Sequence, residues 1–210
     1  GQLGMKAAVV EQAELGGVCL NWGCIPSKAL LRNAEVLSLF HQAEEFGITF
    51  DNLQYDFGKA VDRSREVVTR LTSGVGFLLK RNNVEHVEGV GVLKDRNTVQ
   101  VGGGEQTLTT DNVIVATGAR FRSLPTLPVD GRVVITSREA LELRQVPRRT
   151  VIVGAGATGV EFAYLYRQYG GAVTIVELLP RLVPMEDEEI SKHLEQSFDR
   201  QGITTMTGAR

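Results

Sequence analysis

The sequence predicts an α/β protein in which short apolar strands alternate with helices. Residues 5–11 and 150–153 are nearly continuous apolar runs of strand length, as expected for parallel strands that are buried on both faces. Between these runs, residues 26–45 and 56–81 carry apolar side chains at helical spacing. The chain has 210 residues, of which 42% are hydrophobic, so it is long enough to form one or two domains.

The composition excludes several classes of function. A net charge of −2 gives no reason to expect a nucleic acid or an anionic membrane surface as partner. No apolar run approaches the roughly 20 residues of a membrane-spanning helix. The three histidines are scattered, so no metal site is expected. Two cysteines in a chain of this size favour a reducing compartment, and we expect a cytoplasmic location.

The two cysteines, Cys19 and Cys24, lie close together in the sequence. In a regular helix their Cα atoms would be roughly 8–9 Å apart, whereas a disulfide needs them within about 7 Å. A bridge therefore requires a loop or a distorted helical turn, which Asn21 and Gly23 tolerate. Pro26 suits the first turn of the following helix, whose N-terminus stabilises a thiolate. This pattern favours a redox-active pair, with two buried, unreactive cysteines as the alternative.

A dinucleotide-binding motif follows the strand at residues 150–153. Gly154, Gly156 and Gly159 have the spacing G-x-G-x-x-G and open a predicted helix. They are expected, in that order, to allow a tight turn, the approach of a pyrophosphate and close packing of helix on strand. Glu177 ends the next strand, 18 residues after Gly159. It is expected to accept a hydrogen bond from the ribose 2′-hydroxyl of NAD and to repel the 2′-phosphate of NADP.

Glu11 ends the first predicted strand in the same manner. An acid at this place in a dinucleotide-binding unit binds ribose hydroxyls, although a solvated charge at a strand end is an equal alternative. The glycine-rich turn of such a unit would lie about 20 residues upstream, which is before residue 1. We therefore expect the sequence to be an internal piece of a longer chain.

The middle of the sequence changes to shorter elements. Short strands are predicted at residues 84–92, 98–101 and 106–109, with a glycine turn at residues 102–104. Residues 111–119 are predicted to form a buried strand that runs into a tight glycine turn, and residues 120–149 a connection between domains.

The segment GGVCLNWGCIPSKALL (residues 16–31) resembles the redox-active disulfide motif of the flavin-dependent pyridine nucleotide-disulfide oxidoreductases. Within that family it is most similar to the branch that oxidises dihydrolipoamide, a choice favoured by Leu20, Ile25 and residues 29–31. Mercuric reductases and glutathione-type reductases are the sibling alternatives. A non-enzymatic module that binds NAD or FAD is the alternative from another class, but it would have to keep both cysteines unused.

This resemblance implies two Rossmann-like dinucleotide-binding domains, one for FAD and one for NAD, both incomplete. Residues 1–145 would form the FAD-binding domain without its first strand and glycine-rich turn, and with a small antiparallel sheet inserted. Residues 146–210 would form the first half of the NAD-binding domain. The family's interface domain, which supplies a His–Glu acid/base pair, would be absent, so the chain alone is expected to be inactive.

The resemblance also implies the cofactors FAD and NAD and the residues that serve them. Cys19 would exchange with the substrate dithiol, and Cys24 would form the charge-transfer thiolate beside the flavin. Lys28 and Glu161 would form a partly buried ion pair near the flavin, and for Gly91 relief of a bent strand is an alternative role. The residues implied for FAD are Glu11, Gly16, Gly17, Lys28, Gly91, Ala116, Thr117, Gly118 and Glu161; those implied for NAD are Gly154, Gly156, Gly159 and Glu177.

The implied reaction is electron transfer from a dihydrolipoyl group through the cysteine pair and FAD to NAD⁺. The expected partner is the lipoyl domain of a 2-oxo acid dehydrogenase or glycine cleavage complex. A homodimer is expected for the longer protein, and neither nucleic acid nor a membrane is expected as a partner.

Overall fold

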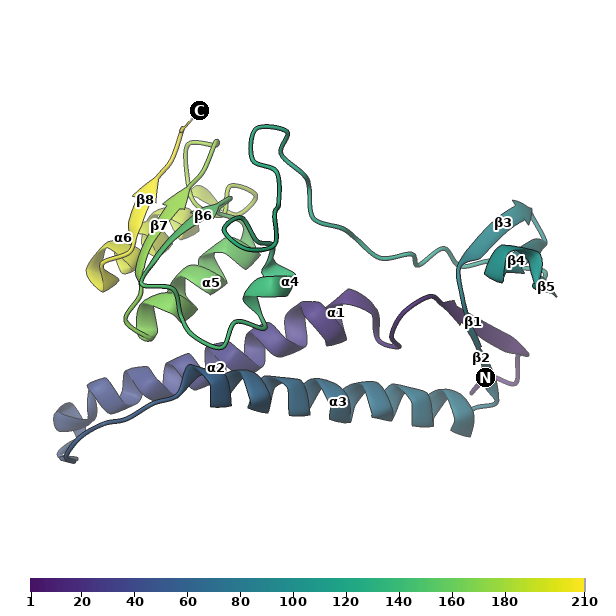
Figure 1. Cartoon of the computed structure of the whole chain (residues 1–210), viewed down its shortest axis with the longest axis horizontal. Helices are drawn as coiled ribbons and strands as arrows, with labels where there is room; N and C mark the ends of the chain where they lie inside the picture. The colour runs from purple at the N-terminus through teal and green to yellow at the C-terminus, as the bar shows by residue number, and fades with distance from the viewer. Residues whose placement is uncertain (210) are drawn as a thin grey trace. The chain divides into compact units, whose positions relative to one another are not determined.

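The structure is a computed structural model that describes residues 1–209, and the chain forms two compact units (Figure 1). Residues 1–25 and 66–128 make up the first unit. Residues 26–65 and the chain from residue 129 onward make up the second. The expected division into an FAD-binding and an NAD-binding domain at residues 145 and 146 stays a prediction.

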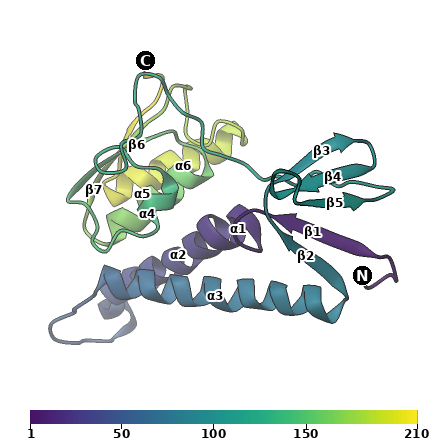
Figure 2. The same ribbon diagram turned by 45° about the vertical axis from the view of Figure 1, so that its right-hand side comes forward.

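The first unit contains a parallel pair of strands, β1 (Ala7–Glu11) and β2 (Val84–Glu88), visible side by side in Figure 2. The predicted strand at residues 84–92 is wrong in one respect, because it is split into two. Gly89 has a φ of +138°, and a Cβ there would lie 2.8 Å from the Val101 side chain. The chain therefore turns at Gly89, leaves the parallel pair and enters a second sheet.

That second sheet is the small antiparallel sheet expected from the sequence. It contains β3 (Gly91–Asp95), β4 (Thr98–Val101) and β5 (Gln106–Thr109) in the order β3-β4-β5. A short 3₁₀ turn, η2 (Gly102–Gly104), connects β4 to β5 as predicted. Figure 2 shows the three strands lying next to one another.

The predicted buried strand at residues 111–119 is wrong. None of these residues forms a β-strand, and Ile114 and Val115 are 91% and 72% exposed. An apolar run becomes a strand only where a neighbouring strand satisfies its backbone N–H and C=O groups. Among residues 1–209, β1 pairs with β2 alone, and no strand lies beside residues 111–119.

The helices follow the predicted spans closely. The first two are α1 (Gly17–Trp22) and α2 (Cys24–His41), and α2 is followed by a short 3₁₀ helix, η1 (Ala43–Phe46). Gly47, with a φ of +72°, caps η1 and ends the helical segment at the predicted place. The long helix α3 covers Phe57–Arg81, one residue shorter than expected.

The second unit contains a parallel sheet in the order β6-β7-β8, with helices as crossovers (Figure 1). Helix α5 connects the first pair of strands and α6 the second, which is the strand–helix repeat of half a dinucleotide-binding fold. The bounds are α4 (Ser137–Ala140), β6 (Arg149–Val153), α5 (Ala157–Gln168), β7 (Ala172–Val176), α6 (Glu188–Gln201) and β8 (Thr204–Met206).

The core of the second unit lies between this sheet and its helices. Ala163 of α5 and Ile175 of β7 are fully buried, and Ile203, just before β8, is 2% exposed. Leu182, in the segment between β7 and α6, is also fully buried. Among residues 1–209, no helix combines the length and the apolar character that crossing a membrane requires.

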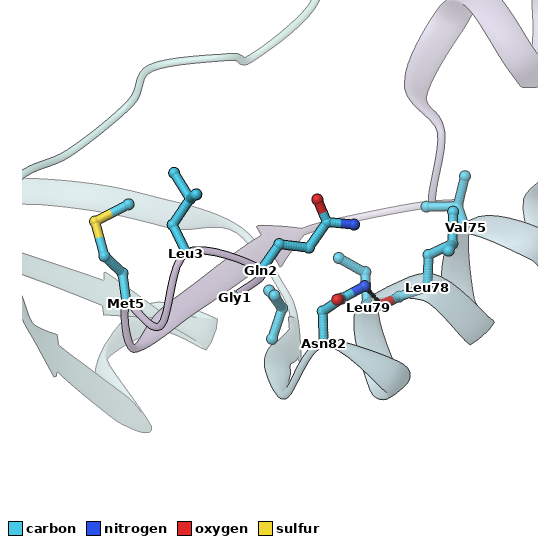
Figure 3. Close-up of a pocket in the computed structure, with 9 residues that line it drawn as sticks. Gly1, Gln2, Leu3, Met5, Val75, Leu78, Leu79 and Asn82 are labelled. Atoms are coloured by element: carbon cyan, nitrogen blue, oxygen red, sulfur yellow. Dashed lines mark hydrogen bonds between the residues drawn. The ribbon is translucent and has the colours of Figure 1, made fainter.

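One pocket in the first unit lies between residues 1–5 and the C-terminal part of α3 (Figure 3). Its volume is about 380 Å³, and its lining is mainly apolar, with Leu3, Met5 and Leu78 among the contributors. The lining includes no ionisable side chain and none of the residues implied in catalysis or cofactor binding. The pocket is therefore not the candidate site.

Candidate functional site

Cys19 and Cys24 are joined by a disulfide, and their Cα atoms are 4.7 Å apart. Cys19 lies within α1, and Cys24 is the first residue of α2. Gly23 separates the two helices, and a Cβ there would lie 3.0 Å from the Val18 carbonyl oxygen. The interruption at Gly23 brings the cysteines closer than a regular helix would, which confirms the expected distorted helical turn.

The Asn21 side chain stabilises this turn through hydrogen bonds to the backbone. The Asn21 residue is 5% exposed, and its amide nitrogen donates hydrogen bonds to the carbonyl oxygens of Leu15 (3.0 Å) and Gly17 (2.9 Å). Sequence reasoning assigned Asn21 only a tolerance of unusual backbone and missed this anchoring role. The available signal was a polar residue at an apolar position between the two cysteines.

The two glycines before the disulfide have backbone conformations that favour glycine. Gly16 and Gly17 have φ values of +95° and +59°. A Cβ at Gly16 would lie 2.6 Å from the Leu20 side chain, whereas a Cβ at Gly17 would meet no atom within 4 Å. A side chain at Gly16 would therefore push on α1, and Gly17 leaves open space beside it.

The other residues implied in FAD binding also lie in the first unit, apart from Lys28 and Glu161. Glu11 is at the carboxyl end of β1, where its Oε1 accepts the Ala13 N–H at 2.9 Å. Gly118 has a φ of +78°, and a Cβ on it would lie 3.9 Å from Val18 of α1. Gly118 therefore lies within van der Waals distance of α1, and the roles implied for Ala116, Thr117 and Gly118 stay predictions.

Gly91 is the first residue of β3. A Cβ at Gly91 would lie 3.2 Å from the Val10 side chain of β1. The glycine therefore permits close approach between the end of β1 and the start of the antiparallel sheet. The bend itself occurs at Gly89, so relief of a bent strand applies to Gly89 and close approach of the chain applies to Gly91.

Lys28 of α2 and Glu161 of α5 form the predicted ion pair, both within the second unit. The Lys28 Nζ lies 2.6 Å from the Glu161 Oε1. The Glu161 side chain is 26% exposed, but that of Lys28 is 61% exposed, so partial burial applies to the glutamate only. An ion pair this exposed adds little stability, and its main effect is to orient the Lys28 ammonium.

The three glycines of the loop between β6 and α5 differ in their surroundings. Gly154 has a φ of +103°, which allows the tight turn. A Cβ at Gly159 would overlap the Gly154 carbonyl oxygen and lie 3.4 Å from Ile152. A Cβ at Gly156 would meet no atom within 4 Å, so the space in front of Gly156 is open. The tight turn at Gly154 and the close packing of helix on strand at Gly159 are as expected, and the approach of a pyrophosphate at Gly156 stays a prediction.

Glu177 follows the last residue of β7, contacts this loop and is 9% exposed. Its Oε2 accepts the Ala155 N–H at 2.7 Å, and its Oε1 accepts the Leu179 N–H at 2.8 Å. Arg181 is turned to other partners, because its guanidinium donates to the carbonyl oxygens of Pro184 (3.3 Å) and Glu186 (3.4 Å). The acid, not the arginine, therefore contacts the glycine-rich loop.

Two further groups fix the segment that leads into β6. The Arg144 guanidinium donates two hydrogen bonds to the Asp62 carboxylate of α3, at 2.5 and 2.8 Å. These bonds lower the pKa of Asp62 and raise that of Arg144. The buried Tyr166 hydroxyl donates to the Ala140 carbonyl oxygen at 3.3 Å, and burial raises the pKa of this phenol.

Among residues 1–209, no group of three or more His, Cys, Asp or Glu could hold a metal ion.

A disulfide at the start of a helix, in a chain that also has a glycine-rich loop between a strand and a helix, is the arrangement expected of the class of disulfide reductases that use a pyridine nucleotide. A family model described as pyridine nucleotide-disulphide oxidoreductase matches residues 1–210. The chain belongs to this family.

Curated relatives match the chain over nearly its whole length. The dihydrolipoyl dehydrogenase of Chlorobaculum parvum is 50% identical over 210 residues, covering 99% of this chain and 45% of that protein. The dihydrolipoyl dehydrogenase of Bacillus subtilis is 42% identical over 220 residues, covering 100% of this chain and 46% of that protein. The chain therefore spans less than half the length of these relatives.

Solved structures show the same arrangement of elements. LpdA from Mycobacterium tuberculosis superposes with a TM-score of 0.88 at 26% identity, covering 98% of this chain and 46% of that one. The HOCl-induced flavoprotein disulfide reductase RclA from Escherichia coli superposes with a TM-score of 0.83 at 27% identity, covering 100% of this chain and 45% of that one.

The family implies FAD and a pyridine nucleotide, and the residues of this chain fit both. For the nucleotide, the open space at Gly156 and the first-turn N–H groups of α5 suit a pyrophosphate. For FAD, Glu11 at the end of β1 suits a ribose, and Gly17 and Gly118 leave room for close approach. At Gly17 and Gly118 the fit depends on positive φ values, which favour glycine.

Proposed function

We propose that the chain forms part of a dihydrolipoyl dehydrogenase, which passes electrons from a protein-bound dihydrolipoyl dithiol through a disulfide and FAD to NAD⁺. The observation that carries this proposal is the Cys19–Cys24 disulfide. The interruption at Gly23 places Cys24 as the first residue of α2. The identity of 50% to a dihydrolipoyl dehydrogenase supports the same substrate class.

The proposed dithiol reaction is an exchange at Cys19. A substrate thiolate attacks the Cys19 Sγ, the Cys19–Cys24 bond breaks, and Cys24 leaves as a thiolate. The second substrate thiol then displaces Cys19, so that the substrate becomes a disulfide and the cysteine pair holds two electrons. Cys24 is the better leaving group because it is the first residue of α2, where unpaired N–H groups and the helix dipole stabilise its negative charge.

The residues implied for FAD would hold that cofactor beside the cysteine pair. Bound FAD supplies two-electron chemistry between the Cys24 thiolate and the nicotinamide. We assign Glu11 to its adenosine ribose and the Lys28–Glu161 pair to the region of the flavin ring. Gly16, Gly17, Gly91, Ala116, Thr117 and Gly118 would line its path.

We assign NAD rather than NADP to the second unit. Glu177 places a carboxylate at the end of β7, where it would accept from a ribose 2′-hydroxyl and repel a 2′-phosphate. Gly154, Gly156 and Gly159 would admit the pyrophosphate to the start of α5. Arg181, the cation that could favour a 2′-phosphate, is engaged with carbonyl oxygens instead.

The proposed partner is the lipoyl domain of a 2-oxo acid dehydrogenase or glycine cleavage complex, and the complete protein is proposed to be a homodimer. We also propose a cytoplasmic location. The support is that both cysteines serve one catalytic disulfide, which matches a compartment that keeps other thiols reduced.

Anaerobic reduction of the complete gene product with dihydrolipoamide tests this function. We expect a long-wavelength charge-transfer absorbance followed by NADH formation once NAD⁺ is added. Cys19→Ser should retain a thiolate at Cys24 and its absorbance but lose turnover, and Cys24→Ser should lose both. Oxidation of NADPH driven by glutathione disulfide or Hg²⁺, without activity towards lipoamide, would overturn the assignment.

A further inference from the structure

Val183, in the segment between β7 and α6, has a backbone conformation that its residue type rarely adopts. Its φ is +38°, although it is β-branched and not a glycine. Pro184 follows it, and a residue before proline is normally restricted to extended conformations. Such strain persists only where neighbouring contacts determine the backbone, and it concentrates at ligand-binding segments.

Contacts on both sides of Val183 hold it in this conformation. Its carbonyl oxygen accepts the Glu186 N–H at 2.8 Å and the buried Ser191 hydroxyl of α6 at 3.4 Å. The preceding residue, Leu182, is fully buried, and its N–H donates to the Glu195 carboxylate of α6 at 3.1 Å. The segment is therefore anchored to the helix that follows it.

The remaining group, the Val183 N–H, reaches the glycine-rich loop. It donates a hydrogen bond to the Ala155 carbonyl oxygen at 2.8 Å. The N–H of Ala155 donates in turn to Glu177 at 2.7 Å, and Ala155 is fully buried. Both backbone polar groups of the middle residue of Gly154-Ala155-Gly156 are thus bonded to the chain between β7 and α6.

This double attachment fixes the peptide planes on either side of Ala155. On either side, the Gly154 N–H donates to the Val176 carbonyl oxygen at 2.8 Å and the Gly156 carbonyl oxygen accepts the Val160 N–H at 3.1 Å, so the contacts of Ala155 complete the attachment of the loop. The first-turn N–H groups of α5, which begin just after Gly156, lack intrahelical acceptors and point toward any ligand at the loop. The orientation of the Ala155 peptides therefore decides how a pyrophosphate meets these donors.

We propose that residues 178–186, here called the clasp, position the glycine-rich loop for the dinucleotide, and that Val183 is the positioning residue through which they act. This inference rests on the proposed nucleotide-binding function of the loop. The strained conformation of Val183 directs its N–H to Ala155 while Leu182 stays in the core. Anchoring to α6 makes nucleotide affinity depend on residues that do not contact the nucleotide.

Three variants of the complete gene product test the role of Val183. Val183→Pro removes the N–H and forbids the positive φ, and we expect it to raise the dissociation constant for NADH about tenfold. Val183→Gly keeps the N–H and accepts the positive φ without strain, so we expect it to restore tight binding. Ser191→Ala removes the hydroxyl contact of α6 to Val183, together with the bond of that hydroxyl to the Asp187 carbonyl oxygen (3.2 Å), and keeps the Leu182–Glu195 contact. We therefore expect a smaller effect, about a threefold weaker affinity.

The readouts separate positioning from general stability. NADH affinity is measured by fluorescence titration, alongside the melting temperature and the rate at which dihydrolipoamide reduces the cysteine pair. We expect the dithiol step to be unchanged in all three variants. Hydrogen exchange at the Val183 amide should accelerate in Ser191→Ala, a change that does not depend on activity.

Each outcome decides the proposal. Unchanged NADH affinity in a folded Val183→Pro protein would overturn it. If that variant does not fold, Ser191→Ala decides, because unchanged NADH affinity would overturn the role of the clasp, whether or not hydrogen exchange at the Val183 amide changes. A parent protein that binds NADPH instead of NADH contradicts the proposed function but still tests the clasp with NADPH. Binding of neither nucleotide by the parent overturns both.

Discussion

Lys28 and Glu161, 133 positions apart in the sequence, form an ion pair with a separation of 2.6 Å between Nζ and Oε1. The pair joins the helix that begins with Cys24 to the helix that begins at the glycine-rich loop. Within the second unit it is a direct contact between a helix implied in dithiol chemistry and a helix implied in nucleotide binding. The carboxylate is the more enclosed partner, so Glu161 fixes the position of the Lys28 ammonium.

Removal of one partner of this pair should affect chemistry more than stability. Glu161→Gln should change the free energy of unfolding by no more than about 1 kcal/mol, because exposed ion pairs contribute little. We expect kcat for NADH formation to fall about tenfold or more, because the ammonium is no longer oriented. Stopped-flow measurement of flavin reoxidation, together with chemical denaturation, checks both expectations.

Lys28→Met and the double variant Lys28→Met/Glu161→Gln provide the control. If the two residues act through their contact, the double variant should be no slower than the worse single variant. Fully multiplicative losses would show that they act independently and would contradict the positioning role of Glu161.

Asn21 should contribute measurably to the stability of the turn that carries the disulfide. Asn21→Ala leaves the carbonyl oxygens of Leu15 and Gly17 without their side-chain donor, in a residue that is 5% exposed. We expect a loss of about 1–3 kcal/mol in the free energy of unfolding. Denaturant unfolding of the oxidised protein measures this loss, and Asn112→Ala, at an exposed position, serves as the matched control.

The local motifs of this chain could be predicted from sequence because short-range geometry determines them. The helix break at Gly23 and the turn at Gly154 each depend on residues within a few positions. The Lys28–Glu161 contact is long-range, and it was predicted only through resemblance to the family. The apolar run at residues 111–119 shows the limit, because strand formation depends on a neighbour that the run itself does not encode.

The clasp could not be predicted for a different reason. Residues 178–186 have no helical or strand periodicity. The positive φ of Val183 falls on a residue type that gives no signal of it, because glycine and asparagine are the usual markers. The burial of Leu182 and the bond to Ala155 arise only when α6 packs against the sheet. Position in the sequence therefore identified Glu177 but not the segment that follows it.

The Asp62–Arg144 pair should make stability depend on pH in the acid range. The hydrogen bonds from Arg144 hold the pKa of the Asp62 carboxyl below its usual range. A carboxyl group whose pKa is lower in the folded state stabilises the fold above its unfolded pKa, and this contribution disappears as the pH falls through the folded value. The wild-type protein should therefore lose part of its advantage over Asp62→Asn below about pH 4.

Urea unfolding of the wild type and of Asp62→Asn between pH 2.5 and pH 7 checks this behaviour. The difference between the two proteins should be constant near neutral pH and shrink in acid. Asp51→Asn, at an exposed position before α3, controls for the loss of one negative charge. A difference that grows as the pH falls would contradict the assigned direction of the Asp62 pKa shift.

Gly156 and Gly159 should respond oppositely to the same change, because a methyl group meets open space at one and backbone at the other. Gly159→Ala would place its Cβ against the Gly154 carbonyl oxygen, so we expect a loss of about 1–3 kcal/mol in the free energy of unfolding. Gly156→Ala has no atom within 4 Å of its Cβ and a negative φ of −72°, so stability should change by less than about 1 kcal/mol. The methyl group would instead occupy the space that a pyrophosphate needs, and NADH affinity should fall at least about tenfold. Equal loss of affinity and stability in both variants would contradict the division of roles between the two glycines.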